Sequence, residues 1–321
     1  MRNLNSVSSD ISKIKVAVPN KAFSNNSTLI EELKEKFSSV TINTEGKRYN
    51  GQDLIDFIGD AEAVIVGLED YNKHIIDSCP RVKFVAKYGV GLDNVDIDYC
   101  REQGIKIGWT AGVNKLSVAE MAIGYMLMLS RNLYVTSNQL KREIWNKSGG
   151  ANLSGKTVGI IGAGHIGKEL IRLLRPFGCR ILVNDIIDQE EYYASVGVES
   201  VEKDQLFRES DVITLHTPHT LETHNMIDAE ALAMMKSSAI VLNTARGELI
   251  DLDALKNALK SKLIAGAAID VYYQEPPEDP ELIEIENLIN TPHIGGNSIE
   301  SILAMGRSAI ESLVEYKERV L

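Results

Sequence analysis

The sequence predicts an α/β protein built from two doubly wound parallel sheets, and three observations support this. Short apolar runs alternate with amphipathic stretches from Lys15 onward, a pattern typical of strand–helix–strand units. The 321 residues exceed what one hydrophobic core usually serves, so two domains are expected. In the stretch from Lys156 to Asp185, KTVGIIGAGHIGKELIRLLRPFGCRILVND, a strand, a glycine turn, a helix and a second strand follow in order.

The glycine turn of this stretch is a complete G-x-G-x-x-G. Gly162 allows the tight turn, Gly164 lets a pyrophosphate approach the backbone, and Gly167 lets helix and strand pack closely. The first amides of the helix can then hold the phosphate, while Asp185, at the tip of the second strand, can accept bonds from a ribose. This order of elements predicts dinucleotide binding; the alternative is a glycine turn without a ligand. The expected contacts of the turn are Gly162, Gly164, His165, Ile166, Gly167 and Asp185.

The first part of the chain predicts a small doubly wound domain without such a fingerprint. The Thr28-x-x-Glu31 spacing predicts a capping box for a helix that runs to Phe37. The expected strands are 16–18, 40–42, 64–66 and 84–86, and the helical pieces between them are 54–58 and 75–79.

A glycine-rich loop follows the strand that starts at Phe84. Lys87-Tyr88-Gly89-Val90-Gly91 lies where ligands of open α/β sheets bind, and the two glycines permit an anion-binding backbone. The alternative is a plain strand-to-helix turn. For Lys87 two interpretations stand: its ammonium binds a second anionic group of a substrate, or it is a solvated surface lysine.

The segment Ser117–Leu129 is apolar nearly all round, which predicts a helix buried on several sides, between domains and against a second subunit. Residues 131–153 are polar and are expected to form an irregular arm. The last helix is expected over residues 298–320.

The strands beyond Asp185 are expected over 212–215, 240–242, 265–269 and 288–290. Each delivers polar residues to one edge of the sheet, where the nicotinamide of a dinucleotide would lie. The cofactor contacts expected at this edge are His216, Thr217, Pro218, Thr244, Ala245, Asp270 and Gly295.

Three residues at these strand ends can do chemistry beside a nicotinamide. Arg246 can bind a carboxylate with two hydrogen bonds and polarise a carbonyl, and His293 can give or take a proton near neutral pH. Glu275 can hold the imidazole and stabilise its charged form. Each residue alone could be a solvated side chain or part of a turn; together, at successive strand ends, they indicate an active site.

Composition limits the partners. The net charge of −11 argues against nucleic acid and anionic membranes, although a local cation can still bind a small anion. No apolar run approaches the roughly 20 residues of a membrane span. The polar start MRNLNSVSSDISK predicts a frayed tail rather than a signal peptide, and hence a cytoplasmic protein. Cys79, Cys100 and Cys179 form no C-x-x-C pair and are expected to be reduced; no metal site is expected.

The motifs KYGVGLDNVD, SVAE, GIIGAGHIG, LHTP, NTARGELID, GAAIDVYYQEPP and NLINTPHIGGNS together resemble the D-isomer-specific 2-hydroxyacid dehydrogenase family. The branch with the greatest similarity is that of phosphoglycerate dehydrogenase and glyoxylate/hydroxypyruvate reductase. The resemblance covers nearly the whole chain from Val16 onward.

The resemblance implies an NAD-dependent oxidoreductase that acts on a D-2-hydroxy acid or a 2-oxo acid. Arg246 would orient the substrate, His293 would be the acid/base with Glu275 as its partner, and Asp270 would lie near the nicotinamide carboxamide. The substrate-binding residues implied are Lys87, Tyr88, Gly89, Val90, Gly91 and Asn114.

The implied architecture is a Rossmann NAD domain, residues 110–297, inserted into a flavodoxin-like substrate domain, residues 1–109 plus 298–321. The family is typically a homodimer formed through the Ser117–Leu129 helix and the arm that follows.

Two departures from the family pattern modify these expectations. No regulatory domain follows the last helix, so no allosteric control by serine is expected, and the arm Trp145–Leu153 looks short. Lys87-Tyr88 stands where the branch often has Arg-Ala, which weakens the inference of a phosphate-bearing substrate. Two alternative functions remain: a formate or phosphite dehydrogenase, and an NAD-sensing dimer without turnover.

Overall fold

The computed structural model describes residues 14–320, which divide into two compact units. The first runs to Asn114 and resumes at Ile299, and the second comprises Lys115–Ser298. The boundaries placed from the sequence, after residue 109 and before residue 298, lie a few residues away. The segment predicted to be a frayed tail lies outside the described residues.

The first unit contains, in its described part, a parallel sheet of five strands in the order β2-β1-β3-β4-β5. This is the flavodoxin-like order, in which the chain reverses its direction of winding between β1 and β3. The short apolar runs form the strands because a parallel sheet covered on both faces needs nearly continuous hydrophobic residues. The strands are β1 Lys15–Val18, β2 Ser39–Ile42, β3 Ala63–Val66, β4 Phe84–Lys87 and β5 Lys106–Gly108.

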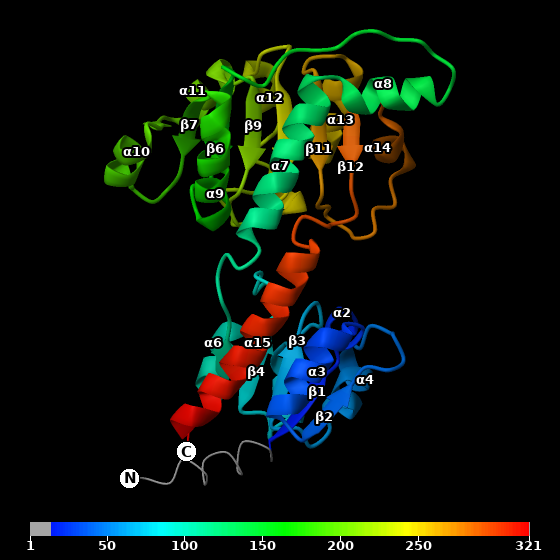
Figure 1. Ribbon diagram of the computed structural model, residues 1–321, viewed down its shortest axis with the longest axis vertical. Coiled ribbons are helices and arrows are strands. Elements are labelled where there is room, and N and C mark those ends of the chain that lie inside the picture. Colours follow the sequence, from blue (N-terminus) through cyan, green and yellow to red (C-terminus); the bar gives the residue numbers. More distant parts are fainter. Residues whose placement is uncertain (1–13, 321) are drawn as a thin grey trace. The chain divides into compact units, whose positions relative to one another are not determined.

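Helices cover both faces of this sheet (Figure 1). The end of the chain returns as α15 Ile299–Val320 and packs beside α2 Lys21–Ser24 and α3 Ser27–Lys36 over one face, where Phe23 and Leu313 share a core. The helices of the other face are α4 Gly51–Ile58, α5 Lys73–Ser78 and α6 Ile97–Glu102.

The start of α3 corrects one prediction. The predicted capping box at Thr28 is wrong, because the N-cap is Asn26, two residues earlier, and the helix begins at Ser27. The side-chain oxygen of Asn26 accepts a hydrogen bond of 3.1 Å from the amide of Leu29. Asn caps a helix as well as Thr does, so the asparagine nearer the preceding turn takes this position.

The second unit contains, in the described chain, a parallel sheet of seven strands in the order β12-β11-β10-β9-β6-β7-β8. This is the Rossmann order extended by one strand, and the winding reverses between β6 and β9. The two sheets confirm the predicted fold class. The strands are β6 Thr157–Ile161, β7 Arg180–Asn184, β8 Glu199–Ser200, β9 Val212–Leu215, β10 Ile240–Asn243, β11 Gly266–Ile269 and β12 Leu288–Asn290.

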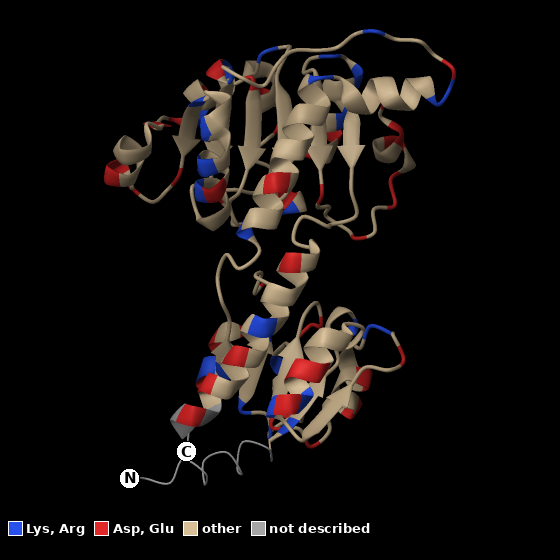
Figure 2. Ribbon diagram, in the orientation of Figure 1, with Lys and Arg blue, Asp and Glu red and all other residues tan. Residues whose placement is uncertain are grey.

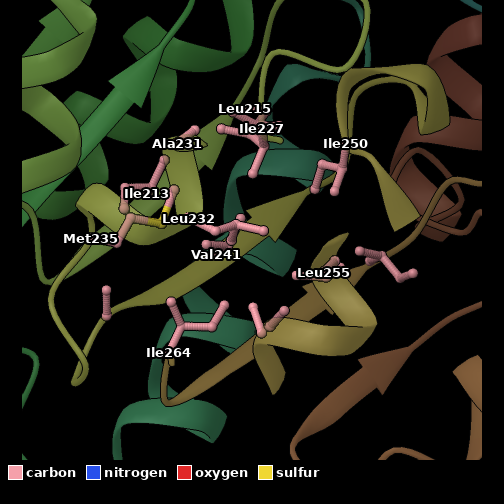
Figure 3. Packing of buried hydrophobic residues seen from close by; sticks show 14 of the residues in the cluster. Ile213, Leu215, Ile227, Ala231, Leu232, Met235, Val241, Ile250, Leu255 and Ile264 are labelled. Carbon is pink, nitrogen blue, oxygen red and sulfur yellow. The ribbon is translucent and has the colours of Figure 1, made fainter. Parts of the chain in front are cut away.

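Two groups of helices sandwich this sheet (Figure 1). On one face lie α7 Lys115–Ser130, α9 His165–Leu174 with the 3₁₀ turn η1 Arg175–Phe177, and α10 Glu190–Val196. On the other face, Leu232 and Leu255 pack against Ile213 and Val241 of the sheet (Figure 3). The elements of that side are α11 Lys203–Glu209, α12 Ala229–Met234, η2 Gly247–Leu249, α13 Leu252–Lys260 and α14 Pro280–Glu284.

The helix α7 is uncharged along nearly all its length (Figure 2). It buries Ala122, Tyr125 and Met126 against the sheet and α9. The arm after it was predicted to be irregular throughout, and this is wrong in part. Residues 133–140 form α8 Leu133–Leu140, and the remaining segment, 141–152, is exposed.

Within the part of the chain that the structure describes, no helix is long and apolar enough to cross a membrane. The three cysteines are free; Cys79 and Cys100 are buried and Cys179 is half-buried.

Candidate active site

The glycine turn after β6 is shaped by close backbone contacts. Gly162 has φ 95°, and a Cβ there would lie 2.5 Å from the carbonyl oxygen of His216, the residue after β9. A Cβ on Gly167 would lie 2.2 Å from the carbonyl oxygen of Gly162. No side chain fits at either position. A Cβ on Gly164 would instead point into open space, on the side from which a ligand can approach.

The turn leads into the N-terminus of α9, where the first backbone amides are available to bind an anion. Gly164 is the N-cap and provides no side-chain hydrogen bond to the first turn. The amides of that turn and the positive end of the helix dipole therefore remain to bind a phosphate. His165 is exposed and Ile166 half-buried at this end of the helix. These residues fit the pyrophosphate of a dinucleotide.

Asp185 lies beside this turn at the end of β7. Its Oδ2 accepts a hydrogen bond of 2.6 Å from the amide of Ala163, and its Oδ1 accepts one of 2.8 Å from the amide of Ile187. The two bonds fix the carboxylate at the position from which a Rossmann domain binds the adenosine ribose. The side chain of Ile186 is fully exposed and brings no positive charge.

His216 lies at the point where the winding of the sheet reverses. Its Nε2 lies 2.9 Å from the hydroxyl of Thr214, and its Nδ1 is buried without a partner among the described residues. Burial lowers the pKa of His216 to about 4, so the imidazole is neutral at pH 7. Thr217 and Pro218 follow it at the same edge, half-buried and exposed respectively.

The loop after β10 holds Arg246. Asn243 donates from its side chain to the Arg246 carbonyl at 2.8 Å and accepts from the Ala245 amide at 3.0 Å, which fixes the loop. Thr244 is buried, and its hydroxyl has no partner in the described chain. A Cβ on Gly247 would lie 2.2 Å from the backbone of Tyr272, so this loop runs directly against the segment that carries Glu275.

His293 and Glu275 form a hydrogen-bonded pair. The Nδ1 of His293 lies 2.8 Å and 3.0 Å from the two carboxylate oxygens of Glu275. Both side chains remain accessible, 49% exposed for His293 and 39% for Glu275. By accepting a hydrogen bond from Nδ1–H, the carboxylate fixes the tautomer and leaves Nε2 to face a reactant.

Asp270, at the end of β11, holds the loop that carries His293. Its Oδ1 accepts from the hydroxyl of Thr291 and, at 2.9 Å, from the amide of Ile294. Its Oδ2 accepts from the amide of Gly295 at 2.7 Å. The resemblance implied that Asp270 lies near the nicotinamide carboxamide. It said nothing about these hydrogen bonds of Asp270 to its own protein.

In the first unit, Lys87 is a buried lysine whose ammonium connects two loops. It is 4% exposed, so the interpretation as a solvated surface lysine is wrong. Its ammonium donates to the carbonyl of Gly67 and, at 2.6 Å, to the side chain of Asn94. Asn94 in turn donates to Gly67 at 3.0 Å, and the amide of Gly67 donates to Glu69 at 2.6 Å. Lys87 thus ties the loop after β4 to the loop after β3.

The remaining predicted substrate residues differ in what they can offer. Tyr88 packs its ring edge-to-face on Phe23 in the core and is 8% exposed. Gly89 has φ 124°, a conformation that glycine adopts readily. Gly91 is half-buried, the carbonyl of Val90 accepts from Trp109 at 2.9 Å, and the buried Oδ1 of Asn114 has no partner among the described residues.

The topology explains which residues meet. Since β10, β11 and β12 are adjacent and parallel, Arg246, Glu275 and His293 follow neighbouring strands at one edge of the second sheet. The predicted substrate residues belong to the first unit. Sequence reasoning missed the Asp270 contacts and the hydroxyl of Thr291, although the position of Thr291 two residues before His293 was a usable signal. The described residues contain no cluster of metal-ligand side chains.

Comparisons with known proteins identify the family. The NAD-binding domain of the D-isomer specific 2-hydroxyacid dehydrogenases matches residues 123–295. The chain is 37% identical over 266 residues to a D-3-phosphoglycerate dehydrogenase of Methanocaldococcus jannaschii, covering 82% of this chain and 51% of that protein. It is 35% identical over 272 residues to a glyoxylate reductase of Korarchaeum cryptofilum, covering 82% of each.

A solved structure extends the similarity to the fold. The D-lactate dehydrogenase of Aquifex aeolicus, complexed with NAD and lactic acid, matches with a TM-score of 0.82 and 25% identity over 95% of each chain. The chain belongs to the D-isomer specific 2-hydroxyacid dehydrogenase family of NAD-dependent oxidoreductases. The predicted family, enzyme class and cofactor are confirmed.

His216 gives a prediction for stability against pH. In the unfolded chain a histidine takes up its proton near its ordinary pKa of 6.5, whereas the folded His216 does so only near 4. The unfolded state therefore binds the extra proton between these values, and stability falls as pH falls through this window. His216→Asn should lose less stability than the wild type between pH of about 7 and about 4.5, measured by thermal unfolding of the cofactor-free protein. His74→Asn, at an exposed position on α5, is the matched control, and equal losses in all three proteins would contradict the assignment.

Proposed function

We propose that this protein reduces a small 2-oxo acid to the D-2-hydroxy acid with NADH, or catalyses the reverse oxidation with NAD. The observation that carries the proposal is the hydrogen-bonded pair of His293 and Glu275, which shares with Arg246 the carboxyl edge of a sheet that also bears the dinucleotide fingerprint. Bound NADH supplies the hydride. The chain's own residues bind and orient the substrate and move the proton that accompanies hydride transfer.

His293 is the proton carrier in this mechanism. In reduction, the protonated imidazole donates from Nε2 to the substrate oxygen while hydride arrives at carbon; in oxidation, the neutral imidazole takes the proton from the hydroxyl. Glu275 accepts the hydrogen bond from Nδ1 and stabilises the imidazolium by its negative charge. The two steps require opposite protonation states of His293.

Arg246 in the second unit and the loop after β4 in the first unit are each proposed as substrate contacts. The guanidinium of Arg246 can take the carboxylate with two hydrogen bonds and polarise the carbonyl. The backbone amides of residues 89–91 provide further donors for the carboxylate, and Asn114 lies at the end of the same unit. We include Lys87 and Tyr88 as supports of this loop, because both side chains are buried.

We further propose that NAD contacts His216, Thr217, Pro218, Thr244, Ala245, Asp270 and Gly295, in addition to the glycine turn and Asp185. These residues follow β9, β10, β11 and β12 at the same edge of the sheet. The buried hydroxyl of Thr244 and the buried Nδ1 of His216 have no partners among the described residues, which supports a polar ligand beside them.

Two other functions are weighed against this proposal. Formate oxidation releases no hydroxyl proton, so the hydrogen-bonded pair of His293 and Glu275 disfavours a formate dehydrogenase; phosphite is disfavoured less. An NAD-sensing dimer without turnover would not need the pair. NADH absorbance with a panel of 2-oxo acids, and NAD⁺ reduction with formate and phosphite, separates the three. Consumption of NADH by none of the 2-oxo acids would contradict the proposal.

The proton-transfer roles predict the pH profiles. The reductive rate should fall with rising pH and the oxidative rate should rise over the same range, because His293 must be protonated for one direction and neutral for the other. Glu275→Gln should move both limbs to lower pH, since the imidazolium loses its charged partner. His293→Ala should remove the limbs and cost roughly 10²–10⁴-fold in rate. Glu278→Gln, which removes a charge from the same exposed segment, is the control. Unmoved limbs in Glu275→Gln would show that Glu275 is not the partner of His293.

Asp185 predicts the choice of cofactor. Its fixed carboxylate should repel a 2′-phosphate, and Ile186 offers no compensating cation. We expect kcat/KM to favour NADH over NADPH by at least about tenfold, and Asp185→Ser to reduce this ratio. Equal efficiencies of the wild type with the two cofactors would refute this role.

The buried position of Lys87 predicts a uniform effect on substrates. Because its ammonium is engaged by Gly67 and Asn94, Lys87→Met should loosen the 89–91 loop and raise KM for glyoxylate and for a dianionic 2-oxo acid by the same factor. A rise confined to the dianionic substrate would show instead that Lys87 reads a second anionic group.

We also propose a cytoplasmic homodimer, formed through the 117–129 helix and the arm. The arm and α8 expose Leu133, Leu140, Ile144 and Trp145, the last to 76%, and α7 leaves further apolar residues only half-buried. Monomers rarely expose such a patch. Light scattering should give the mass of a dimer at micromolar concentration, and Trp145→Ser should weaken the association. A monomeric wild type would refute this part of the proposal.

A further inference from the structure

The loop that carries His293 has an uncommon backbone conformation. His293 itself has φ 51°, in the left-handed region that a residue with a side chain rarely adopts. Asp270 holds one side of this loop through Thr291, Ile294 and Gly295. Such a strained backbone persists only where surrounding contacts fix it.

The other side of the loop is held by α7. The hydroxyl of Ser117 donates to the carbonyl of Gly295 at 2.7 Å and accepts from the amide of Ser298 at 3.4 Å. A Cβ on Gly295 would lie 3.1 Å from Met121, so the helix packs tightly on this residue. Two turns after Ser117, the hydroxyl of Tyr125 is hydrogen-bonded to the hydroxyl of Thr291.

The direction of this bond follows from the number of protons. The Thr291 hydroxyl carries one proton and donates it to Oδ1 of Asp270. Thr291 must therefore accept from Tyr125. Burial raises the pKa of the Tyr125 hydroxyl, so this group stays a neutral donor. The chain of bonds runs from Tyr125 through Thr291 to Asp270, and Asp270 holds the two residues after His293.

We propose that Tyr125 is a positioning residue for His293, acting through Thr291 on the loop that presents the imidazole to Glu275 and to the substrate. The inference rests on the proposed role of His293 as proton carrier. The Tyr125 ring is 4% exposed in the core of the second unit, and its hydroxyl lies 3.5 Å from Sδ of Met121 on the same helix and is hydrogen-bonded to Thr291 of the catalytic loop. The helix proposed for assembly thereby also supports the active site.

The test uses Tyr125→Phe in the full chain, which removes one hydroxyl and keeps the ring. Tyr71→Phe is the matched control, because the Tyr71 hydroxyl is buried in the first unit with no partner among the described residues. We expect kcat of Tyr125→Phe to fall roughly tenfold, while KM for NADH stays unchanged. This loss is smaller than the ~10²-fold loss of rate that a 1 Å misplacement of a reacting group causes. Thr291→Val, which also removes the bond to Asp270, should give at least this loss, and Tyr71→Phe should leave kcat unchanged.

A lower rate could also result from a smaller fraction of folded enzyme. The kinetic isotope effect with NADH deuterated at the transferred position distinguishes this from a misplaced imidazole. A misplaced imidazole slows the chemical step, so the isotope effect on kcat should grow in Tyr125→Phe. A smaller fraction of folded enzyme would lower the rate at an unchanged isotope effect and an unchanged pH profile, and this outcome would overturn the inference.

A second measurement needs neither cofactor nor turnover. Diethyl pyrocarbonate modifies accessible neutral imidazoles, and peptide mass spectrometry reads the modification at His293 separately from the other histidines. The rate at His293 should rise several-fold in cofactor-free Tyr125→Phe and stay unchanged in Tyr71→Phe. An unchanged rate in Tyr125→Phe would overturn the inference. Because this result does not depend on the substrate, it stands apart from a failure of the proposed function, which would show as a wild type that reduces no 2-oxo acid.

Discussion

The parallel pairing of β10, β11 and β12 is the constraint on which the active site depends. Their register places the ends of the three strands at one edge, Asn243 beside Ile269 and Ile269 beside Asn290. Each of the three loops that follow then supplies one residue of the proposed active site, Arg246, Glu275 or His293. Arg246 lies three residues after its strand, whereas Glu275 and His293 also need the contacts of their own loops to reach each other.

The same principle operates at the points where the winding reverses. In the second unit, Gly162 and His216 follow the two strands on either side of the reversal and approach so closely that no Cβ fits between them. In the first unit, Gly67 and Asn20 occupy the equivalent places, and a Cβ on Gly67 would lie 2.0 Å from the Asn20 side chain. The reversal in the second unit leaves the N-terminus of α9 without a side-chain cap, so its amides are available to a phosphate. The reversal in the first unit is filled by protein groups, including Glu69 and the buried ammonium of Lys87.

Local patterns in the sequence were sufficient to predict the glycine turn and most of the strands, but they missed β5 Lys106–Gly108 and β8 Glu199–Ser200. Buried parallel strands are short apolar runs, and their polar ends can be read directly, so the residues that share an edge follow from the topology. The capping residue of α3 was missed because Asn26 and Thr28 are both suitable caps two positions apart, and the choice depends on where the preceding turn ends. The helix α8 was missed because it was grouped with the polar segment that follows it, and none of its residues is buried to mark one face.

Contacts between residues distant in sequence could not be predicted. In the sequence, Lys87 is a cation next to a glycine-rich loop, which is typical of an accessible residue. It is buried because its ammonium bonds to the carbonyl of Gly67, twenty positions earlier, and such a contact cannot be predicted from local sequence. Tyr125 lies in a helix that is apolar on all sides, where a single hydroxyl gives no periodic signal; its partner Thr291 lies 166 positions further on.

The stereochemistry and origin of the transferred hydrogen test the central claim most directly. The protein should be incubated with hydroxypyruvate and NADH deuterated at the transferred position, and the product analysed by chiral chromatography and mass spectrometry. The account predicts D-glycerate with one deuterium at C2, supplied by the cofactor, and a hydroxyl proton that comes from solvent. The L-isomer, a racemic product, or glycerate without deuterium at C2 would contradict it.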